Sequence, residues 1–287
     1  MKVADYMQTD VVHVYVPGTR EDVLQLMAEK EINGLPVVKK GTKKLVGIVT
    51  RTDLLRKADE DQLAMLMVRD PLTVTPTTDL SVAAELMREH NYRRLPVVVD
   101  EELVGLISIP DILGAVLENN AQAQEIAIKD FVTRSIMAVW EKTPLPLAYM
   151  IMDMAQQSAL VVLNASGGVT GLITVSDFIR LSEETVENNV STTFSGTENA
   201  VDWGWTSKDF LVVTKKLLKM PDVAIETIVT RDIISVTEVT TVAECVRIMR
   251  KNDIDQAPVL SASGNLIGMI EDRNLLDLAI KLLKESR

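Results

Sequence analysis

The chain has 287 residues, of which 47% are hydrophobic and 25% are charged, and its formal net charge is −11 at pH 7. This mixture is typical of a globular protein and argues against a disordered or fibrous chain. The acidic balance argues against binding to duplex DNA or RNA, because clustered lysine and arginine side chains supply most of that affinity. The single cysteine, Cys245, excludes an internal disulfide.

The sequence predicts no membrane segment and no signal peptide. The longest apolar runs, such as residues 159–163, have the length of a strand and are too short to cross a bilayer. Residues 1–6 contain no apolar signal core. We therefore expect a cytoplasmic protein that does not bind a membrane.

The first predicted unit has the order strand, helix, strand, strand, helix. Its first strand covers residues 10–14 and precedes an amphipathic helix. Residues 35–38 and 45–50 are typical of two strands of a hairpin, since a polar turn at residues 39–42 joins them. Asp53 then begins the last helix.

The second unit repeats this order. A strand is predicted at residues 70–74, and a helix at residues 78–87 has apolar side chains at positions 82, 83, 86 and 87. Thr78 and Asp79 precede this apolar stripe and can accept hydrogen bonds from the first backbone N–H groups of the helix. A second hairpin follows, and Asp111 begins its last helix.

The third and fourth units begin with strands at residues 134–139 and 232–236. An insertion separates them, from about residue 182 to 222. We expect a polar loop at residues 191–197 and a helix at residues 210–218 that Pro221 stops. Trp203 and Trp205 lie between them; we expect them to dock the insertion onto the core, with a partner contact or a ligand lid as the alternative.

All four units end with a glycine and two apolar residues, and in the first three a hydroxyl follows and, three positions on, an aspartate. The four glycines are Gly47, Gly105, Gly171 and Gly268. Such self-similarity predicts a repeat fold. The predicted repeats cover residues 1–58, 66–118, 126–182 and 223–287, with the insertion at 183–222. A unit this short cannot bury both faces of its sheet, so we expect repeats 1 and 2, and repeats 3 and 4, to pair.

The glycine-to-aspartate endings, each behind the same strand–helix–hairpin order, resemble the cystathionine-beta-synthase (CBS) domain family. A Leu-Pro-Val or Ala-Pro-Val strand precedes three of them, whereas Leu160 replaces the proline in the third repeat. Four repeats without an appended enzyme resemble the gamma subunits of AMP-activated protein kinase and stand-alone archaeal four-repeat proteins. The resemblance implies an α/β (α+β) fold of four β-α-β-β-α repeats, paired into two Bateman modules that form a disc. It also implies regulatory binding of adenine nucleotides or of adenosyl ligands such as S-adenosylmethionine.

Three aspartates are candidate ribose ligands, since one carboxylate can accept hydrogen bonds from two adjacent hydroxyls. Asp53, Asp111 and Asp177 each stand at a helix start, where the helix dipole favours a negative charge. Helix capping is the competing interpretation, and it is compatible with ribose binding. By the resemblance, the hydroxyls three positions earlier line the ribose-phosphate part of the cleft: Thr50, Ser108 and Thr174.

The resemblance implies that adenine is held by the first strand of each repeat, through backbone groups and apolar side chains. The corresponding residues are Val12 and His13, Leu72 and Thr73, Ile136 and Met137, and Ile233 and Ile234.

Arg93 and Arg94 are the candidate phosphate ligands. Two arginines that enter a buried strand must be desolvated or must reach the mouth of a cleft. By the resemblance, basic residues at these positions face the phosphates at the centre of the disc. The matching residues of the other repeats are not basic, so we expect sparse positive charge there: Asn33, Gly34, Gln157, Ser158, Asp255 and Gln256. Arg51, Arg134, Arg231 and Arg273 are further donors by position, although we expect them at the surface.

The fourth repeat departs from the pattern, because Glu271 replaces the hydroxyl and Asn274 replaces the aspartate. A negative charge beside a phosphate lowers affinity, so we expect a weak or empty site there. His13 and His90 are the only histidines, and no cluster has metal-ligand spacing. We find no nucleophile–base pair and no phosphate-binding loop, so no catalysis, catalytic cofactor or metal is expected.

The sequence therefore favours a non-catalytic regulator that binds AMP, ADP or ATP between paired repeats and senses the energy state. Its expected partner is an unidentified regulated protein, and a homodimer is compatible with the sequence. One alternative ligand is S-adenosylmethionine or methylthioadenosine. The others are a ligand-independent scaffold and a nucleic-acid-binding regulator, against which the charge argues.

Overall fold

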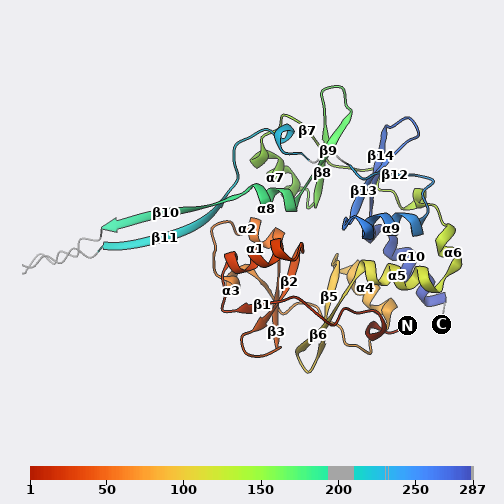
Figure 1. Cartoon of the computed structure of the whole chain (residues 1–287), viewed down its shortest axis with the longest axis horizontal. Helices are drawn as coiled ribbons and strands as arrows, with labels where there is room; N and C mark the ends of the chain where they lie inside the picture. Colours follow the sequence, from red (N-terminus) through yellow and green to blue (C-terminus); the bar gives the residue numbers. More distant parts are fainter. Residues whose placement is uncertain (193–209, 230, 232, 286–287) are drawn as a thin grey trace, which may run out of the picture.

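The computed structural model describes residues 1–192, 210–229, 231 and 233–285. The chain forms a flat disc of four repeats around a common centre (Figure 1). Repeat 2 lies between repeats 1 and 4, and repeat 3 lies between repeats 1 and 4 on the opposite side. This arrangement confirms the predicted fold class and the disc.

Repeats 1 and 2 have the predicted order of elements. Repeat 1 contains β1 (Val14–Val16), α1 (Arg20–Glu29), β2 (Gly34–Lys39), β3 (Leu45–Thr50) and α2 (Arg51–Arg56). Repeat 2 contains α4 (Leu80–Glu89), β5 (Arg94–Val99), β6 (Glu102–Ser108) and α5 (Ile109–Asn119). The place of its first strand is taken by a single bridge between Val74 and Val97.

Repeats 3 and 4 follow the same order. Repeat 3 contains β7 (Ala138–Trp140), α7 (Leu145–Met154), β8 (Ala159–Leu163), β9 (Val169–Thr174) and α8 (Val175–Leu181). Repeat 4 contains β12 (Val236–Thr237), α9 (Val242–Lys251), β13 (Gln256–Leu260), β14 (Leu266–Glu271), the 3₁₀ helix η4 (Asp272–Leu275) and α10 (Leu276–Glu285). In each full sheet the first strand is parallel to the second, which is antiparallel to the third.

The first strands begin later than the sequence predicted. We expected strands over residues 10–14, 70–74, 134–139 and 232–236, but the ladders start at Val14, Val74, Ala138 and Val236. The preceding residues of repeats 1 to 3 approach the sheet without joining its regular ladder. This leaves part of their backbone unpaired at the edge of the sheet.

The two repeats of each module exchange the segments that precede them. Residues 1–8, which include η1 (Val3–Asp5), pair with repeat 2 through Gln8 and Leu106. Residues 60–69, which include α3 (Leu63–Leu66) and β4 (Val68–Arg69), pair with repeat 1. In the second module, α6 (Ala121–Glu125) and η2 (Ile128–Phe131) pack toward repeat 4, whereas η3 (Ile225–Thr227) joins repeat 3. Each module is therefore interlocked.

This exchange explains the glycine of the repeated ending. A Cβ atom on Gly268 would lie 2.5 Å from the carbonyl oxygen of Thr133, in the exchanged segment. A Cβ on Gly47 would lie 2.9 Å from the Val68 oxygen, and one on Gly105 would lie 3.0 Å from the Gln8 oxygen. Only glycine lets the exchanged backbone approach so closely.

The modules meet in two different ways. Buried side chains of repeats 2 and 4 form one continuous hydrophobic core, to which α4, α5, α9 and α10 contribute. Repeats 1 and 3 keep separate cores. Leu55 of α2 is buried in the core of repeat 3, and Ile179 of α8 packs against the core of repeat 1.

The insertion differs from its prediction. β10 (Glu183–Thr192) and β11 (Phe210–Lys219) form an antiparallel hairpin that extends away from the disc (Figure 1). The predicted helix over residues 210–218 is therefore wrong. The predicted polar loop falls only partly on β10; Trp203, Trp205 and the rest of that loop lie outside the described residues.

Candidate functional site

Each of the three aspartates predicted to bind ribose is the third residue of the last helix of its repeat, and the hydroxyl residue three positions earlier is the N-cap. In repeat 1, Asp53 Oδ2 accepts hydrogen bonds from the backbone N–H (2.8 Å) and the hydroxyl (2.6 Å) of Thr50. Asp177 Oδ2 accepts the same pair from Thr174, both at 2.9 Å. In repeat 2 the Ser108 N–H lies 2.9 Å from Asp111 Oδ2, and its hydroxyl donates to the same oxygen. Each pair is a capping box.

The cap occupies only one carboxylate oxygen. Within the part of the chain that the structure describes, the other oxygen of Asp53 and of Asp111 accepts no hydrogen bond. The second oxygen of Asp177 accepts one from the exposed Arg180, at 2.8 Å. All three side chains are partly buried. Capping therefore leaves an acceptor available to a ligand, most openly in repeats 1 and 2.

Repeat 4 keeps the cap with a different side chain. Asn274 Oδ1 accepts a hydrogen bond of 2.8 Å from the Glu271 N–H. The Glu271 carboxylate lies 2.7 Å from Arg273 Nε. An amide has only one oxygen, so after capping it offers NH₂ donors in place of a second acceptor.

The predicted adenine residues lie at the same edge of each sheet as the aspartates. In repeat 1, Gly34 at the start of β2 pairs with Thr50, and Val14 pairs in parallel with Val37. Val12 and His13 therefore run past the start of β2, with Thr50 on its other side. The other repeats have the equivalent register.

Several of these residues have unused backbone donors. The N–H groups of Val12, Leu72 and Thr73 donate to no residue that the structure describes. Leu72, Thr73, Ile136, Ile233 and Ile234 are partly buried, and Met137 is 38% exposed. His13 is already engaged, with its Nδ1 2.8 Å from the Val11 carbonyl and its ring against Tyr15.

Arg93 is held by two carboxylates of repeat 4. Its Nη1 pairs with Asp255 and its Nη2 with Asp272, whose side chain is only 4% exposed. Burial raises the pKa of Asp272, although the Arg93 charge lowers it in part. Neither Asp255 nor Asp272 was predicted as a site residue, because their contact with Arg93 depends on repeats 2 and 4 being neighbours.

Arg94 of repeat 2 and Arg51 of repeat 1 each lie near a neighbouring repeat. Arg94 Nη1 is 3.5 Å from the Gly34 carbonyl of repeat 1, and burial together with the Arg93 charge lowers the Arg94 pKa. Arg51 was expected at the surface but is partly buried, and its Nε has no partner among the described residues. Burial lowers the pKa of Arg51, while the charge of Asp177 in repeat 3 raises it.

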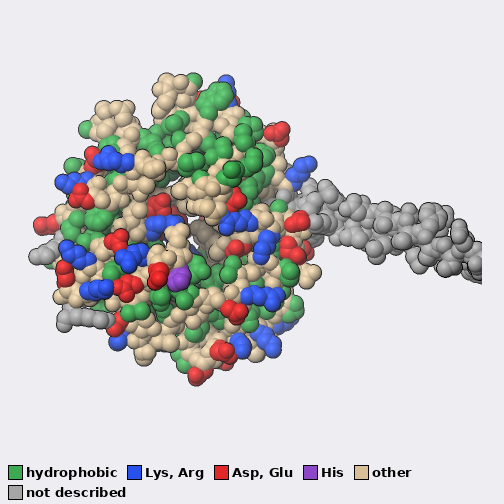
Figure 2. Space-filling model, turned by 180° about the vertical axis from the view of Figure 1, so that it is seen from behind, with side chains coloured by type: hydrophobic (Ala, Val, Ile, Leu, Met, Phe, Trp, Pro, Cys, Tyr) green, Lys and Arg blue, Asp and Glu red, His purple; other side chains and the backbone are tan. Residues whose placement is uncertain are grey.

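Arg134 and Arg231 lie in exposed positions. Arg134 pairs with Glu238 at 2.7 Å, and Arg231 donates to the Glu226 carbonyl at 3.2 Å. Neither of these contacts involves another candidate ligand residue. Seen from behind, basic and acidic side chains lie together around a hollow near the middle of the disc (Figure 2).

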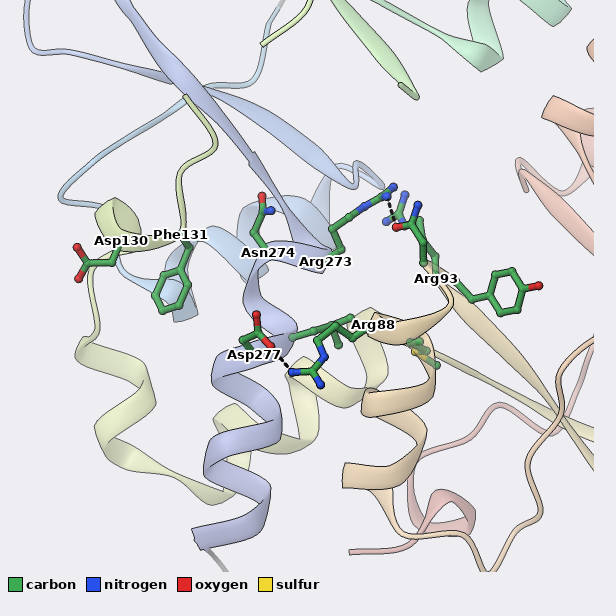
Figure 3. Close-up of a pocket in the computed structure, with 11 residues that line it drawn as sticks. Arg88, Arg93, Asp130, Phe131, Arg273, Asn274 and Asp277 are labelled. Atoms are coloured by element: carbon green, nitrogen blue, oxygen red, sulfur yellow. Dashed lines mark hydrogen bonds and ion pairs between the residues drawn. The ribbon is translucent and has the colours of Figure 1, made fainter. Parts of the chain in front are cut away.

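A pocket of about 490 Å³ lies between repeats 2 and 4 (Figure 3). Arg88 and Arg93 line it from repeat 2, and Arg273 and Asn274 line it from repeat 4. Asp130 and Phe131 of the exchanged segment complete the wall, which is why the sequence did not predict this pocket. All three arginines are already paired; Arg88, for example, lies 2.6 Å from Asp277.

Two predicted absences concern metals and membranes. Among the described residues, no group of three or more His, Cys, Asp or Glu side chains could hold a metal ion. No helix in the described ranges has both the length and the apolar character to span a bilayer.

Cys245 is buried in the core, where desolvation raises the pKa of its thiol to about 12.

Known proteins share this architecture. A model of the CBS domain matches residues 3–60, 63–118, 128–184 and 225–281. The chain is 26% identical to the uncharacterized protein MJ1225 of Methanocaldococcus jannaschii, over 96% of this chain and 97% of that protein. The MJ1225 crystal structure, described as that of a proposed archaeal homologue of g-AMPK, has a TM-score of 0.77 at 22% identity and covers 97% and 99% of the two chains.

Two further similarities differ in extent. An uncharacterized conserved protein of Pyrococcus horikoshii has a TM-score of 0.63 at 27% identity, over 97% of this chain and 100% of that one. Inosine-5'-monophosphate dehydrogenase of Nitrosopumilus maritimus is 39% identical over 93 residues, 32% of this chain but only 19% of the enzyme. No catalytic property follows from so partial a match. The four matched segments cover most of the sequence, and the chain belongs to the CBS domain family.

Proposed function

We propose that this chain is a non-catalytic regulatory protein that binds AMP, ADP or ATP in clefts between paired CBS repeats. The observation that carries the proposal is the capping box of the first three repeats. It fixes an aspartate at the edge of each sheet and uses one oxygen of that aspartate. In repeats 1 and 2 the second oxygen is left for the ribose hydroxyls, whose hydrogen bonds to a carboxylate belong to the stronger class.

The unpaired backbone beside each aspartate supports adenine as the base. Adenine presents a donor and acceptors on its edge, which extended backbone groups can match. Val12, Leu72 and Thr73 have such unused N–H groups, and their partly buried side chains offer an apolar surface to the ring. The site therefore combines an apolar slot with a few fixed polar groups, as small-molecule sites generally do.

The distribution of charge favours ligands with few phosphates. Arg94 and Arg51 are partly buried donors that lie near a neighbouring repeat, whereas Arg93 is neutralised by two carboxylates. Each added phosphate brings negative charge that these groups must balance. We therefore expect AMP to bind more tightly than ATP. Repeat 4, with Asn274 and Glu271, is the weakest of the four sites.

The neutralised Arg93 also favours a second candidate, an adenosyl sulfur compound such as the sulfonium S-adenosylmethionine or the thioether methylthioadenosine. These ligands need the ribose acceptor and the adenine slot but no phosphate donor. A cationic sulfonium would also lie favourably near Asp111, Asp255 and Asp272. The two candidates differ in whether Arg94 contributes to binding.

A titration of nucleotide-stripped protein tests the proposal, with AMP, ADP, ATP, S-adenosylmethionine, methylthioadenosine and GTP as ligands. A ligand at about 100 times its dissociation constant should add ~2.7 kcal/mol to the free energy of unfolding per site. We expect adenine nucleotides to bind and GTP not to bind. Arg94→Ala should weaken AMP binding and leave the affinity for S-adenosylmethionine and methylthioadenosine unchanged. Binding of these two ligands alone would select the second candidate, and no binding by any ligand would leave a ligand-independent scaffold.

The regulatory output would be a change in module packing that a partner protein reads. A ligand changes such an equilibrium only if it binds two packing states with different affinity. The thin contact between repeats 1 and 3 is the place where such a change requires the least repacking, since their cores are separate.

A further inference from the structure

Arg93 is a candidate phosphate ligand, but its guanidinium group is already paired with carboxylates of this chain. Both of its terminal nitrogens pair with carboxylates of repeat 4, Asp255 at the start of β13 and Asp272 at the start of η4. Its side chain is 29% exposed and that of Asp255 is 31% exposed, so both can be reached from solvent. Figure 3 shows Arg93 and Arg273 pointing toward one another at one end of the pocket between the repeats.

The same position is neutral in the other half of the disc. Asn33 of repeat 1 is the counterpart of Arg93, and its Oδ1 accepts a 3.1 Å hydrogen bond from Ser176 of repeat 3. In repeat 4 the counterpart of Arg93 is Asp255 itself, so repeats 2 and 4 carry opposite charges at equivalent places. Only the contact between repeats 2 and 4 is therefore an ion pair at this position in the described chain.

Carboxylate and phosphate oxygens are alternative acceptors for one guanidinium group. Both can accept two parallel N–H hydrogen bonds from it, and both favour its positive charge. A phosphate that binds Arg93 must displace at least one of the two aspartates. As long as the aspartates stay in place, they repel a phosphate nearby, and the repulsion grows with the charge of the ligand.

We infer that Asp255 and Asp272 act as internal competitors of nucleotide phosphate for Arg93, and that they set the preference for AMP over ADP and ATP. This inference rests on the proposed function and assigns its specificity to two residues outside the repeated motif. It also links binding to packing, since a phosphate on Arg93 breaks an ion pair that joins the two modules. By reciprocity, tighter packing of repeats 2 and 4 weakens phosphate binding.

The test measures dissociation constants of AMP, ADP, ATP, adenosine and inorganic pyrophosphate by titration calorimetry. The proteins are wild type, Asp255→Asn, Arg93→Ala and the double variant. Asp255→Asn removes one negative charge near Arg93, so the affinity for ADP and ATP should rise about tenfold. The affinity for AMP should rise less, and that for adenosine should not change. In the Arg93→Ala background the same substitution should change each constant less than about twofold, since the competition is then absent.

Two further variants complete the design. Glu244→Gln removes one negative charge from repeat 4 at a 50% exposed side chain on α9 that pairs with Arg247, and it should leave the constants unchanged. Asp272→Asn is the second probe of the competition and should act in the same direction as Asp255→Asn. Thermal unfolding of each variant establishes that it is folded at the temperature of the titration.

The outcomes separate the two proposals. If wild type binds AMP but neither aspartate variant tightens ADP, the competition is refuted and the proposed function stands. If no variant binds adenosine or AMP while Asp255→Asn tightens pyrophosphate only when Arg93 is present, the competition stands and the proposed function fails. If no variant binds any nucleotide, adenosine or pyrophosphate, both are refuted.

Discussion

Repeats 2 and 4 share one hydrophobic core, whereas repeats 1 and 3 have separate cores and meet through short helices. The difference lies in the last helix of each repeat. α5 has 11 residues and α10 has 10, whereas α2 has 6 and α8 has 7. Longer helices place more apolar side chains at the contact between the modules, so more surface leaves water there.

The polar contacts differ in the same way. Between repeats 2 and 4, Arg93 pairs with the buried Asp272, and Lys284 lies 2.5 Å from Glu85. Between repeats 1 and 3, the exposed pair Arg56–Asp153 at 2.7 Å accompanies the hydrogen bond from Ser176 to Asn33. The same repeat thus builds a fused interface on one side of the disc and a looser one on the other. We expect the first to anchor the disc and the second to respond to ligands.

Truncation of one buried leucine in each half tests this difference most strongly. Leu276→Ala, at a side chain 1% exposed within the shared core, should cost about 3–5 kcal/mol, because the surrounding helices cannot collapse into the cavity. Leu55→Ala, at 4% exposure between repeats 1 and 3, should cost about 2–3 kcal/mol, since the looser contact can relax. Urea unfolding measures both values. Equal costs, or a larger cost for Leu55→Ala, would remove the distinction between the halves.

Removal of Arg93 is expected to have the next largest effect on stability. Arg93→Ala leaves Asp272 buried without its ion-pair partner, which should cost about 2–3 kcal/mol, less than for a fully buried pair because Arg93 and Asp255 are partly exposed. The same substitution combined with Asp272→Asn should recover part of that loss. A single variant as stable as wild type would show that the ion pair contributes nothing to the anchor.

The buried carboxyl of Asp272, at the contact between repeats 2 and 4, should make the free energy of unfolding depend on pH. Its pKa is raised in the folded state, so the native protein binds more protons than the unfolded chain between the ordinary carboxyl pKa and the raised value. The free energy of unfolding contributed by this group therefore falls as pH rises through that window. Urea unfolding of wild type and Asp272→Asn across this range measures the difference between their free energies of unfolding. We expect this difference to shift in favour of the variant as pH rises. A shift in favour of wild type would mean that the folded-state pKa of Asp272 is lowered.

The smallest effect is expected at the exposed ion pair between repeats 1 and 3. Arg56 and Asp153 are 41% and 36% exposed, and pairs of this kind contribute about 0–1 kcal/mol. Arg56→Ala should therefore change the free energy of unfolding by less than about 1 kcal/mol, and less still at high salt. A loss above about 2 kcal/mol would show that this contact is tighter than its exposure indicates.

The local parts of the fold could be predicted from the sequence. Hydrophobic periodicity and the repeated ending predicted the β-α-β-β-α order. The last helices were predicted to begin at the aspartates, whereas they begin two residues earlier, after the hydroxyl residues that are their N-caps. The helix predicted at residues 210–218 was wrong, since these residues form strand β11. Val212, Val213 and Thr214 are β-branched and favour a strand, and the partner strand β10 lies too far away in sequence to be seen locally.

The contacts between modules could not be predicted in the same way. Arg93 was identified because two arginines before a buried strand are costly, but its partner Asp272 lies 179 positions away. That contact requires the order of repeats around the disc, which no single repeat encodes. The exchanged segments could not be predicted for the same reason. The sequence shows the glycine of each repeated ending, but it does not show which distant segment packs against that glycine.

The central claim, that aspartates of the first three repeats bind the ribose of an adenine nucleotide, can be tested by one titration. AMP is titrated into wild type and into the triple variant Asp53→Asn, Asp111→Asn and Asp177→Asn. Asn274 shows that an amide keeps the helix cap in this fold, so the variant loses the second carboxylate oxygen without losing the cap. We predict saturable binding to wild type and an affinity at least about tenfold weaker for the variant. Unchanged affinity in a folded triple variant would contradict the assignment of the ribose site.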